Sequence, residues 1–243
     1  MTDLIFKVMK KFITPLPQLA LIHPGMVGKN DLPHLRDGMA AIMMFGIGFA
    51  PISALALSLM GIFTLPVATL ILVIPSLVIA IGLSFYHPEY GRLMLRAYLM
   101  GIIAVACYDC VRIPFTMIGW MDDFIPKIGG MLVEDGNPHA LIGYLWRYLG
   151  NGGGMGMAFV TAYALLRHRF LMLRLLGGLK TALLFGFFVW ACLIITLKIS
   201  PQGEDLMFVI TPSSLLLSLI GHLVFGCTLG CLVNRFRPEE MGK

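Results

Sequence analysis

Charged residues are scarce in this sequence, and their scarcity excludes an ordinary soluble fold. Only 13% of the 243 residues are Asp, Glu, Lys or Arg, whereas 58% are hydrophobic and the mean hydropathy is +0.86. Soluble domains are about half apolar and about one quarter charged. The sequence therefore predicts an all-α polytopic integral membrane protein, most of which has lipid as its solvent.

The sequence also lacks cysteines in polar loops. Its five cysteines lie within apolar stretches: Cys107, Cys110, Cys192, Cys227 and Cys231. A secreted disulfide framework needs cysteines in aqueous segments, so this pattern excludes one. No basic residue stands within either close pair to favour the thiolate form, so we expect small apolar side chains and no bound metal.

Several functional signals are missing as well. Residues 1–36 lack the order of basic, apolar and cleavage regions that marks a signal peptide, so we expect the mature protein to keep them. The apolar segments contain no Ser-His-Asp order, paired carboxylates or His-Glu-x-x-His motif, so an enzymatic function lacks its usual residues. The net charge of +5 gathers in short segments between apolar stretches, which favours lipid headgroups over nucleic acid as its partner.

Six segments are apolar and long enough to span a bilayer. They cover residues 39–60, 62–85, 97–120, 139–166, 171–197 and 206–233, the fifth with an amphipathic entry over residues 171–180. Gly61 leaves the first two almost no loop and predicts a tight hairpin, and a longer polar loop is expected over residues 121–138. The chain thus divides into an N-terminal segment 1–36, a transmembrane domain 37–237 and a tail 238–243.

Residues 1–14 carry an apolar stripe with helical spacing beside Lys7, Lys10 and Lys11. Such a segment is typical of an amphipathic helix that lies in the membrane interface against anionic lipid headgroups. Pro15 and Pro17 end the pattern. We therefore predict an N-terminal interfacial helix.

Basic residues fall mostly on one side of the six expected spans. With the N-terminus inside, the inner segments hold fourteen Lys and Arg residues, whereas the outer loops hold only Lys127 and Lys198. The aromatic residues Trp120, Tyr144, Trp146 and Tyr148 fall near the outer side. Both patterns predict cytoplasmic termini, and we expect a bacterial cytoplasmic (inner) membrane or an internal membrane derived from it.

Charged residues also lie within the apolar segments, where a charge costs several kcal/mol unless it is paired or hydrated. Asp109 and Arg112 share one face of the third segment, and Arg147 and Asn151 share one face of the fourth. We predict a polar cluster of Tyr108, Asp109, Arg112, Arg147, Asn151 and His222. Within it, Asp109 contacts Arg112 or Arg147 directly or through water, unless Arg147 reaches the outer headgroups instead. The cluster is either a structural latch or a site for a proton, an ion or an anionic headgroup.

His222 in the sixth segment is also a possible ligand of a haem or pigment. A second histidine at similar depth is missing, because His139 lies at the outer edge. We therefore favour no cofactor and a core histidine that donates to a backbone carbonyl or to Asp109.

Two glycine pairs have the spacing of close helix contacts, Gly152 with Gly156 and Gly226 with Gly230. Two functions remain open. In the first, the protein is a non-catalytic helical subunit or assembly factor of a membrane complex, in which the glycine faces contact other membrane subunits or a second copy. In the second, it is a transporter or channel for a small solute, ion or proton that uses the polar cluster. We favour the first, because the sequence contains one polar cluster instead of a continuous polar path.

Overall fold

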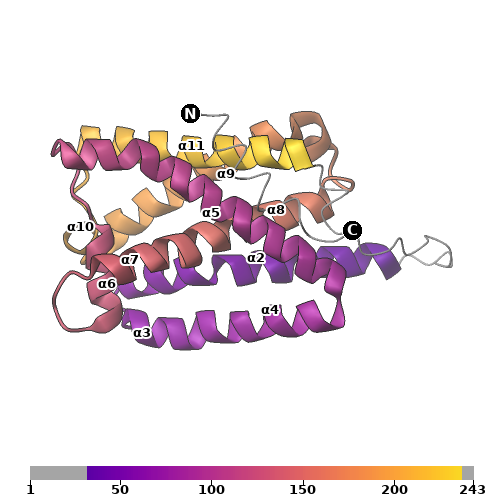
Figure 1. The fold of residues 1–243 in the computed structure, drawn as a ribbon, viewed down its shortest axis with the longest axis horizontal. Coiled ribbons are helices and arrows are strands. Elements are labelled where there is room, and N and C mark those ends of the chain that lie inside the picture. Colours follow the sequence, from indigo (N-terminus) through magenta and orange to yellow (C-terminus); the bar gives the residue numbers. More distant parts are fainter. Residues whose placement is uncertain (1–31, 237–243) are drawn as a thin grey trace. The chain divides into compact units, whose positions relative to one another are not determined.

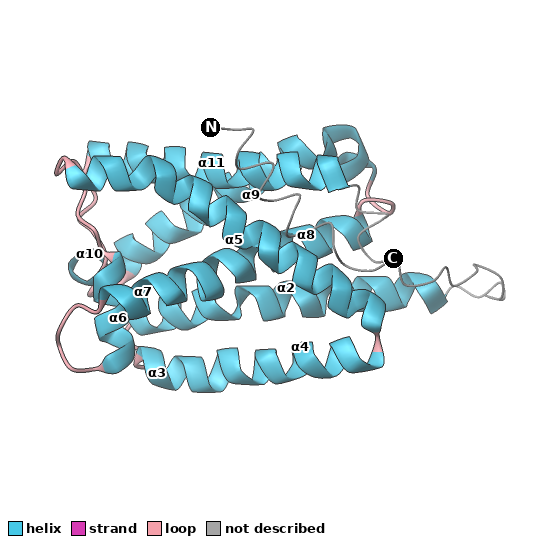
Figure 2. Cartoon of the chain, in the orientation of Figure 1, coloured by secondary structure: helices cyan, strands magenta, loops and turns pink. Residues whose placement is uncertain are grey.

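The computed structural model describes residues 32–236, which form helices joined by short connections and contain no β-strand (Figures 1 and 2). The elements in order are α2 (Leu32–Leu59), α3 (Leu65–Ala68), η1 (Thr69–Val73), α4 (Ile74–Tyr86), α5 (Pro88–Met117), α6 (Ile125–Val133), α7 (Ala140–Leu145), η2 (Trp146–Gly152), α8 (Gly153–Leu166), α9 (Leu171–Ile199), α10 (Gly203–Leu206) and α11 (Pro212–Phe236). The expected interfacial helix over residues 1–14 and the tail 238–243 lie outside the described residues.

Five helices in the described range are long and apolar enough to cross a membrane: Gly38–Leu59, Leu65–Tyr86, Pro88–Met117, Leu171–Ile199 and Pro212–Phe236. They confirm an all-helical protein with membrane-spanning helices. The expected fourth span, residues 139–166, is not among the five. It forms α7, η2 and α8, which follow one another with helical backbone angles at both junctions.

The ends of the other helices differ from those expected. The third span was expected at residues 97–120, but α5 begins at Pro88, because proline suits the first turn of a helix. The sixth was expected from Leu206, whereas a short helix ends there and α11 begins at Pro212. In α9 the backbone leaves helical geometry at Gly177 (φ 70°), which separates the amphipathic entry from the rest of the helix.

The expected polar loop over residues 121–138 is a second correction, because it contains the helix α6. This short helix buries Ile125 and Ile128, each 1% exposed, beside Phe124. It ends at Glu134, whose positive φ of 61° closes the last turn by a bond from its N–H to the carbonyl of Gly130. The segment therefore folds back onto the bundle, while its acidic residues remain exposed.

Glycines bring the helices into close contact. A Cβ added at Gly101 of α5 would lie 2.8 Å from the Cα of Gly156 in α8, and one at Gly48 of α2 would lie 2.7 Å from the backbone N of Ala158. Helix α8 thus packs tightly against both α2 and α5. A Cβ at Gly152 would meet Val105, and Cβ atoms at Gly226 and Gly230 would meet the backbone of α9. The four glycines singled out from the sequence therefore line contacts between helices of this one chain.

Three connections meet at one end of the bundle. The Ser200 hydroxyl donates to the carbonyl of Leu59, and Lys127 Nζ donates to the carbonyl of Asp205 at 3.1 Å. These bonds join the segments that follow α2, α5 and α9. Figure 1 shows the long helices running alternately toward and away from this end.

Candidate functional site

A buried ion pair joins α5 to η2. Arg147 donates from Nε to Oδ1 and Oδ2 of Asp109, both at 2.9 Å, and from Nη2 to Oδ1 at 2.6 Å. Arg112 donates from Nε to the same Oδ1 at 3.0 Å. Asp109 is 1% exposed, and its carboxylate accepts from both guanidinium groups. Asp109 was expected to contact Arg112 or Arg147, and in the structure it contacts both directly.

Arg112 extends this network toward the end of the bundle. Its Nη1 donates to Asp123 Oδ1 at 2.9 Å, and its Nη2 donates to the Tyr144 hydroxyl at 2.9 Å. The Tyr144 hydroxyl in turn donates to Asp123 Oδ2 at 2.9 Å. Three nitrogens of Arg112 thus have acceptors, which suits the fixed fork of a guanidinium group.

The network contains two arginines and two aspartates, so its formal charge is zero. A buried pair is stable only when hydrogen bonds satisfy both ions, and here every carboxylate oxygen of Asp109 and Asp123 accepts at least one bond. Asp109 lies eight residues before the end of α5, which is about 12 Å along the axis. The network therefore lies nearer to the end of α5 than to its middle.

Asp123 and Tyr144 are members that the sequence interpretation missed. Asp123 was assigned to the polar loop and Tyr144 to the aromatic residues of the outer side. The apolar spacing of Ile125, Ile128 and Leu132 was the available signal, because it marks a helix with one buried face directly after Asp123.

Aromatic rings hold the other side of Arg147. Its Cζ lies 4.5 Å from the ring centroid of Tyr108, and the Tyr108 ring meets the His222 ring edge-on at 5.3 Å. His222 Nδ1 lies 2.7 Å from the carbonyl of Ser218. A carbonyl only accepts, so Nδ1 of His222 donates this bond. His222 therefore bonds a backbone carbonyl, and in the described part of the chain it has no hydrogen bond to Asp109.

A small cavity of about 120 Å³ lies beside these rings. Among the residues that line it, five carry polar groups: Tyr108, Arg147, Asn151, Thr196 and His222. The Asn151 Oδ1 is buried and has no hydrogen-bond partner in the described part of the chain. Asp109 does not line the cavity. The six residues predicted as one cluster thus divide into a paired charge network and a polar cavity that share Arg147.

The cavity bears on the possible cofactor at His222. Sites for small molecules and cofactors usually measure about 300–1,000 Å³, whereas the cavity that His222 lines measures about 120 Å³. It is large enough for several water molecules.

The local backbone of η2 helps to place these groups. Trp146–Gly152 is a π-helical turn, a form that often occurs at functional sites. Arg147 and Asn151 remain on one face across this turn, with Arg147 toward α5 and Asn151 at the cavity. Asn151, Gly152 and the glycines that follow resist regular helix formation, which suits an irregular turn.

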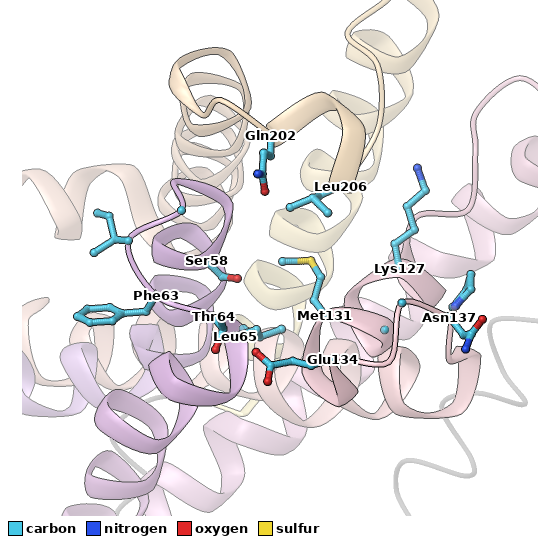
Figure 3. Close-up of a pocket in the computed structure, with 15 residues that line it drawn as sticks. Ser58, Phe63, Thr64, Leu65, Lys127, Met131, Glu134, Asn137, Gln202 and Leu206 are labelled. Atoms are coloured by element: carbon cyan, nitrogen blue, oxygen red, sulfur yellow. The ribbon is translucent and has the colours of Figure 1, made fainter.

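A second hollow lies where the three connections meet, and Figure 3 shows its lining residues. Its volume is about 600 Å³, and Ser58, Thr64, Glu134 and Gln202 contribute polar groups. Nearby, Asp135 Oδ1 accepts from the N–H of Asn137 at 3.0 Å, and Oδ2 lies 2.7 Å from His139 Nε2. The bond from the Asn137 backbone, followed by the His139 contact, holds the pKa of Asp135 below its ordinary value.

Comparisons with protein-family models, with curated proteins and with solved structures yield no match. The class of the protein therefore comes from its fold: five apolar helices of spanning length make it a helical integral membrane protein. Its particular function has to be inferred from the network, the cavity and the exposed helix faces.

Proposed function

We propose that the chain crosses the membrane six times, with α7, η2 and α8 as the sixth span. Their sequence is less apolar than that of the other five, but residues 152–161 are all buried against other helices. A span enclosed by protein does not need an apolar surface toward lipid. In a chain with six spans of alternating direction, the connections after the first, third and fifth spans lie on one side. The three connections of the structure do meet at one end.

Six spans place both termini on the same side, and the fourteen basic residues of the inner segments favour the cytoplasm of a bacterial inner membrane. Reporter fusions at each terminus test this orientation. A reporter active only in the cytoplasm should be active at both ends. Activity at one end alone would support five spans instead.

We further propose that the protein is a non-catalytic helical subunit or stabilising factor of a membrane complex. The observation that carries this proposal is the exposure of the helix Leu65–Tyr86. Only 6% of its spanning window is buried, whereas the other four helices bury 28% to 50%. Within the chain this helix gains little packing, so contact with a second membrane protein supplies what the bundle does not.

The other features fit a structural role. The charge network is neutral and closed, so it holds α5, η2 and the start of α6 together as a latch. The glycine faces are occupied by helices of the same chain, so they are not the docking surface first expected. The docking surface is instead the outer face of η1 and α4, where Leu70, Ile74 and Val78 are 45% to 65% exposed.

Purification from native membranes in a mild detergent tests this proposal. We expect a stoichiometric membrane partner that is lost when Leu70, Ile74 and Val78 are all changed to Ala. Changing Leu184, Phe187 and Ile195 on the exposed face of α9 to Ala is the matched control, because these residues are 49% to 58% exposed. A stable monomer without partner, or equal loss in both variants, would refute the assignment.

A second candidate function is transport of a small solute or a proton, and the cavity is the observation that favours it. Arg147, Asn151 and His222 bring donors and acceptors from η2 and α11 to one enclosed space. Asp109 is not the carrier in this version, because two arginines occupy its carboxylate.

Proteoliposomes separate the two candidates. Asn151→Leu and His222→Phe remove the polar groups of the cavity while keeping most of its volume. If the protein transports, water, proton or small-solute fluxes should exceed those of empty vesicles and should fall in both variants. Fluxes equal to those of empty vesicles would remove this candidate.

A further inference from the structure

The hollow where the three connections meet contains a hydrogen-bonding group that the chain leaves unused. Ser58, near the end of α2, is only 9% exposed and lines the hollow, and its hydroxyl has no hydrogen bond to any of residues 32–236. In Figure 3 this hydroxyl points into the hollow, toward α6. Buried hydroxyls normally have a partner, and where the chain supplies none, water or a ligand does so. The hollow therefore offers a hydrogen-bonding position to a molecule that enters it.

The charge that faces the hollow is negative. Glu134 lines it and extends in Figure 3 from α6 toward the opposite wall, and its carboxylate has no ion pair among the described residues. Lys127 lines the hollow as well, but its Nζ donates to the carbonyl of Asp205 and points away from Glu134. A carboxylate only accepts hydrogen bonds. The matching ligand therefore carries a positive charge and hydrogen-bond donors.

The lining suits a small organic cation better than a metal ion. Glu134 is the only carboxylate among the described residues that line the hollow, whereas Ca²⁺ takes about six to eight oxygen ligands. Residues 32–236 also contain no group of three or more His, Cys, Asp or Glu side chains placed to hold a metal. Leu65, Met131 and Leu206 make part of the wall apolar, which suits the carbon atoms of an organic ligand. The volume of about 600 Å³ is typical of sites for such molecules.

We propose that the hollow binds a primary alkylammonium ion, which donates to the Glu134 carboxylate and the Ser58 hydroxyl while its carbon chain lies against the apolar part of the wall. A primary ammonium group has three N–H donors, and the amide oxygen of Gln202 is an acceptor at the same hollow. Free amines carry this group, and so does the ethanolamine headgroup of a phospholipid. The site is separate from the outer face of η1 and α4, which does not line the hollow.

Titration of the full-length protein with butylammonium chloride tests the proposal. Saturation-transfer nuclear magnetic resonance in detergent at neutral pH, with empty micelles as the blank, should show saturable binding. Tetramethylammonium has the same charge without an N–H, and butanol has no charge, so both should bind at least about tenfold more weakly. Equal binding of the three probes, or no saturable binding of butylammonium, would overturn the proposal.

Variants of Glu134 and Ser58 locate the site. Glu134→Gln should weaken binding about tenfold, and Glu134→Gly should do the same while keeping the turn, because glycine suits the positive φ of 61°. Ser58→Ala should weaken binding about three- to tenfold, as expected for one hydrogen bond. Asp122→Asn is the matched control, because Asp122 is an exposed acid just before α6 that does not line the hollow. Wild-type affinity in both Glu134 variants would overturn the assignment.

Lipid composition distinguishes the two sources of the ammonium group. Butylammonium is titrated against the protein in nanodiscs of phosphatidylcholine, with and without added phosphatidylethanolamine. A lower affinity in the presence of phosphatidylethanolamine identifies the lipid headgroup as a ligand of the hollow. Equal affinity in the two nanodiscs identifies a soluble amine instead.

Discussion

Arg147 donates from Nε to both carboxylate oxygens of Asp109 at 2.9 Å, and this pair ties the π-helical turn to α5. Neither residue is more than 8% exposed. Lipid supplies no water that could hydrate either ion, so each ion depends on the other for its stabilisation.

Removing one partner of the pair should destabilise the protein more than removing both. Asp109→Leu leaves Arg147 and Arg112 facing an apolar side chain, and loss of a single partner from a buried ion pair lowers stability by about 3–5 kcal/mol. The double variant Asp109→Leu with Arg147→Met removes the uncompensated charge of Arg147 and should recover part of this loss. Unfolding of the detergent-solubilised protein by denaturant, read by circular dichroism, measures both. Strictly additive effects in the double variant would contradict a coupled pair.

Tyr144 should contribute through its hydroxyl, because it bridges Arg112 and Asp123. Tyr144→Phe removes one acceptor from Arg112 and one donor to Asp123, and we expect a loss of about 1–3 kcal/mol, as for hydrogen bonds to charged groups. Tyr86→Phe is the control, because Tyr86 is 84% exposed. If the two variants unfold at the same denaturant concentration, the bridge is not a stabilising element.

The charge pair was predictable from the sequence, whereas its full extent was not. A charge inside an apolar segment must be paired, and only Arg112 and Arg147 were available to Asp109 at similar depth. Asp123 lies in a segment that composition marks as a polar loop. Its side chain stays 34% exposed, and only the packing of α6 against the bundle, a tertiary contact, brings it within hydrogen-bond distance of Arg112.

Tertiary contacts also decide the roles of the glycine pairs and of Trp146, and the sequence alone does not show them. Their spacing predicted close helix contacts, but spacing alone does not tell a contact within one chain from a contact with a partner. The helical class follows from hydropathy, and five of the six expected apolar segments contain helices that are apolar enough to cross the membrane. Residues 152–161 of the fourth segment are buried by other helices, so its composition reflects contacts that a hydropathy scale does not contain. Trp146 was assigned to the aromatic residues of the outer side, because its burial in the bundle is likewise a tertiary contact.

Gly101 should tolerate no side chain, because α5 and α8 meet there. In Gly101→Ala the new Cβ would lie 2.8 Å from the Cα of Gly156 and 2.9 Å from its N, atoms of a backbone that cannot rotate away. We expect the helices to separate with a loss of about 1–3 kcal/mol. Gly46→Ala is the matched control, since no atom lies within 4 Å of the added Cβ, and it should gain up to about 1 kcal/mol from helix propensity. Thermal unfolding in the same detergent compares them, and equal melting temperatures would argue against the tight contact.

Asp135 should titrate below the ordinary aspartate value of about 3.9. Its pKa is lowered first by the Asn137 backbone N–H and then by His139, so the charged form is stabilised in the folded loop. Charged Asp135 therefore stabilises the folded loop fully at a pH above its pKa in the unfolded chain. This stabilisation is lost as the pH falls through the lower pKa of the folded chain. The loop should therefore hold its structure until the solution is more acidic than about pH 4. Carboxyl carbon shifts from a nuclear magnetic resonance titration in nanodiscs give the midpoint. In His139→Ala the midpoint should rise only part of the way toward the ordinary value, because the Asn137 bond remains. A full return would assign the shift to His139 instead.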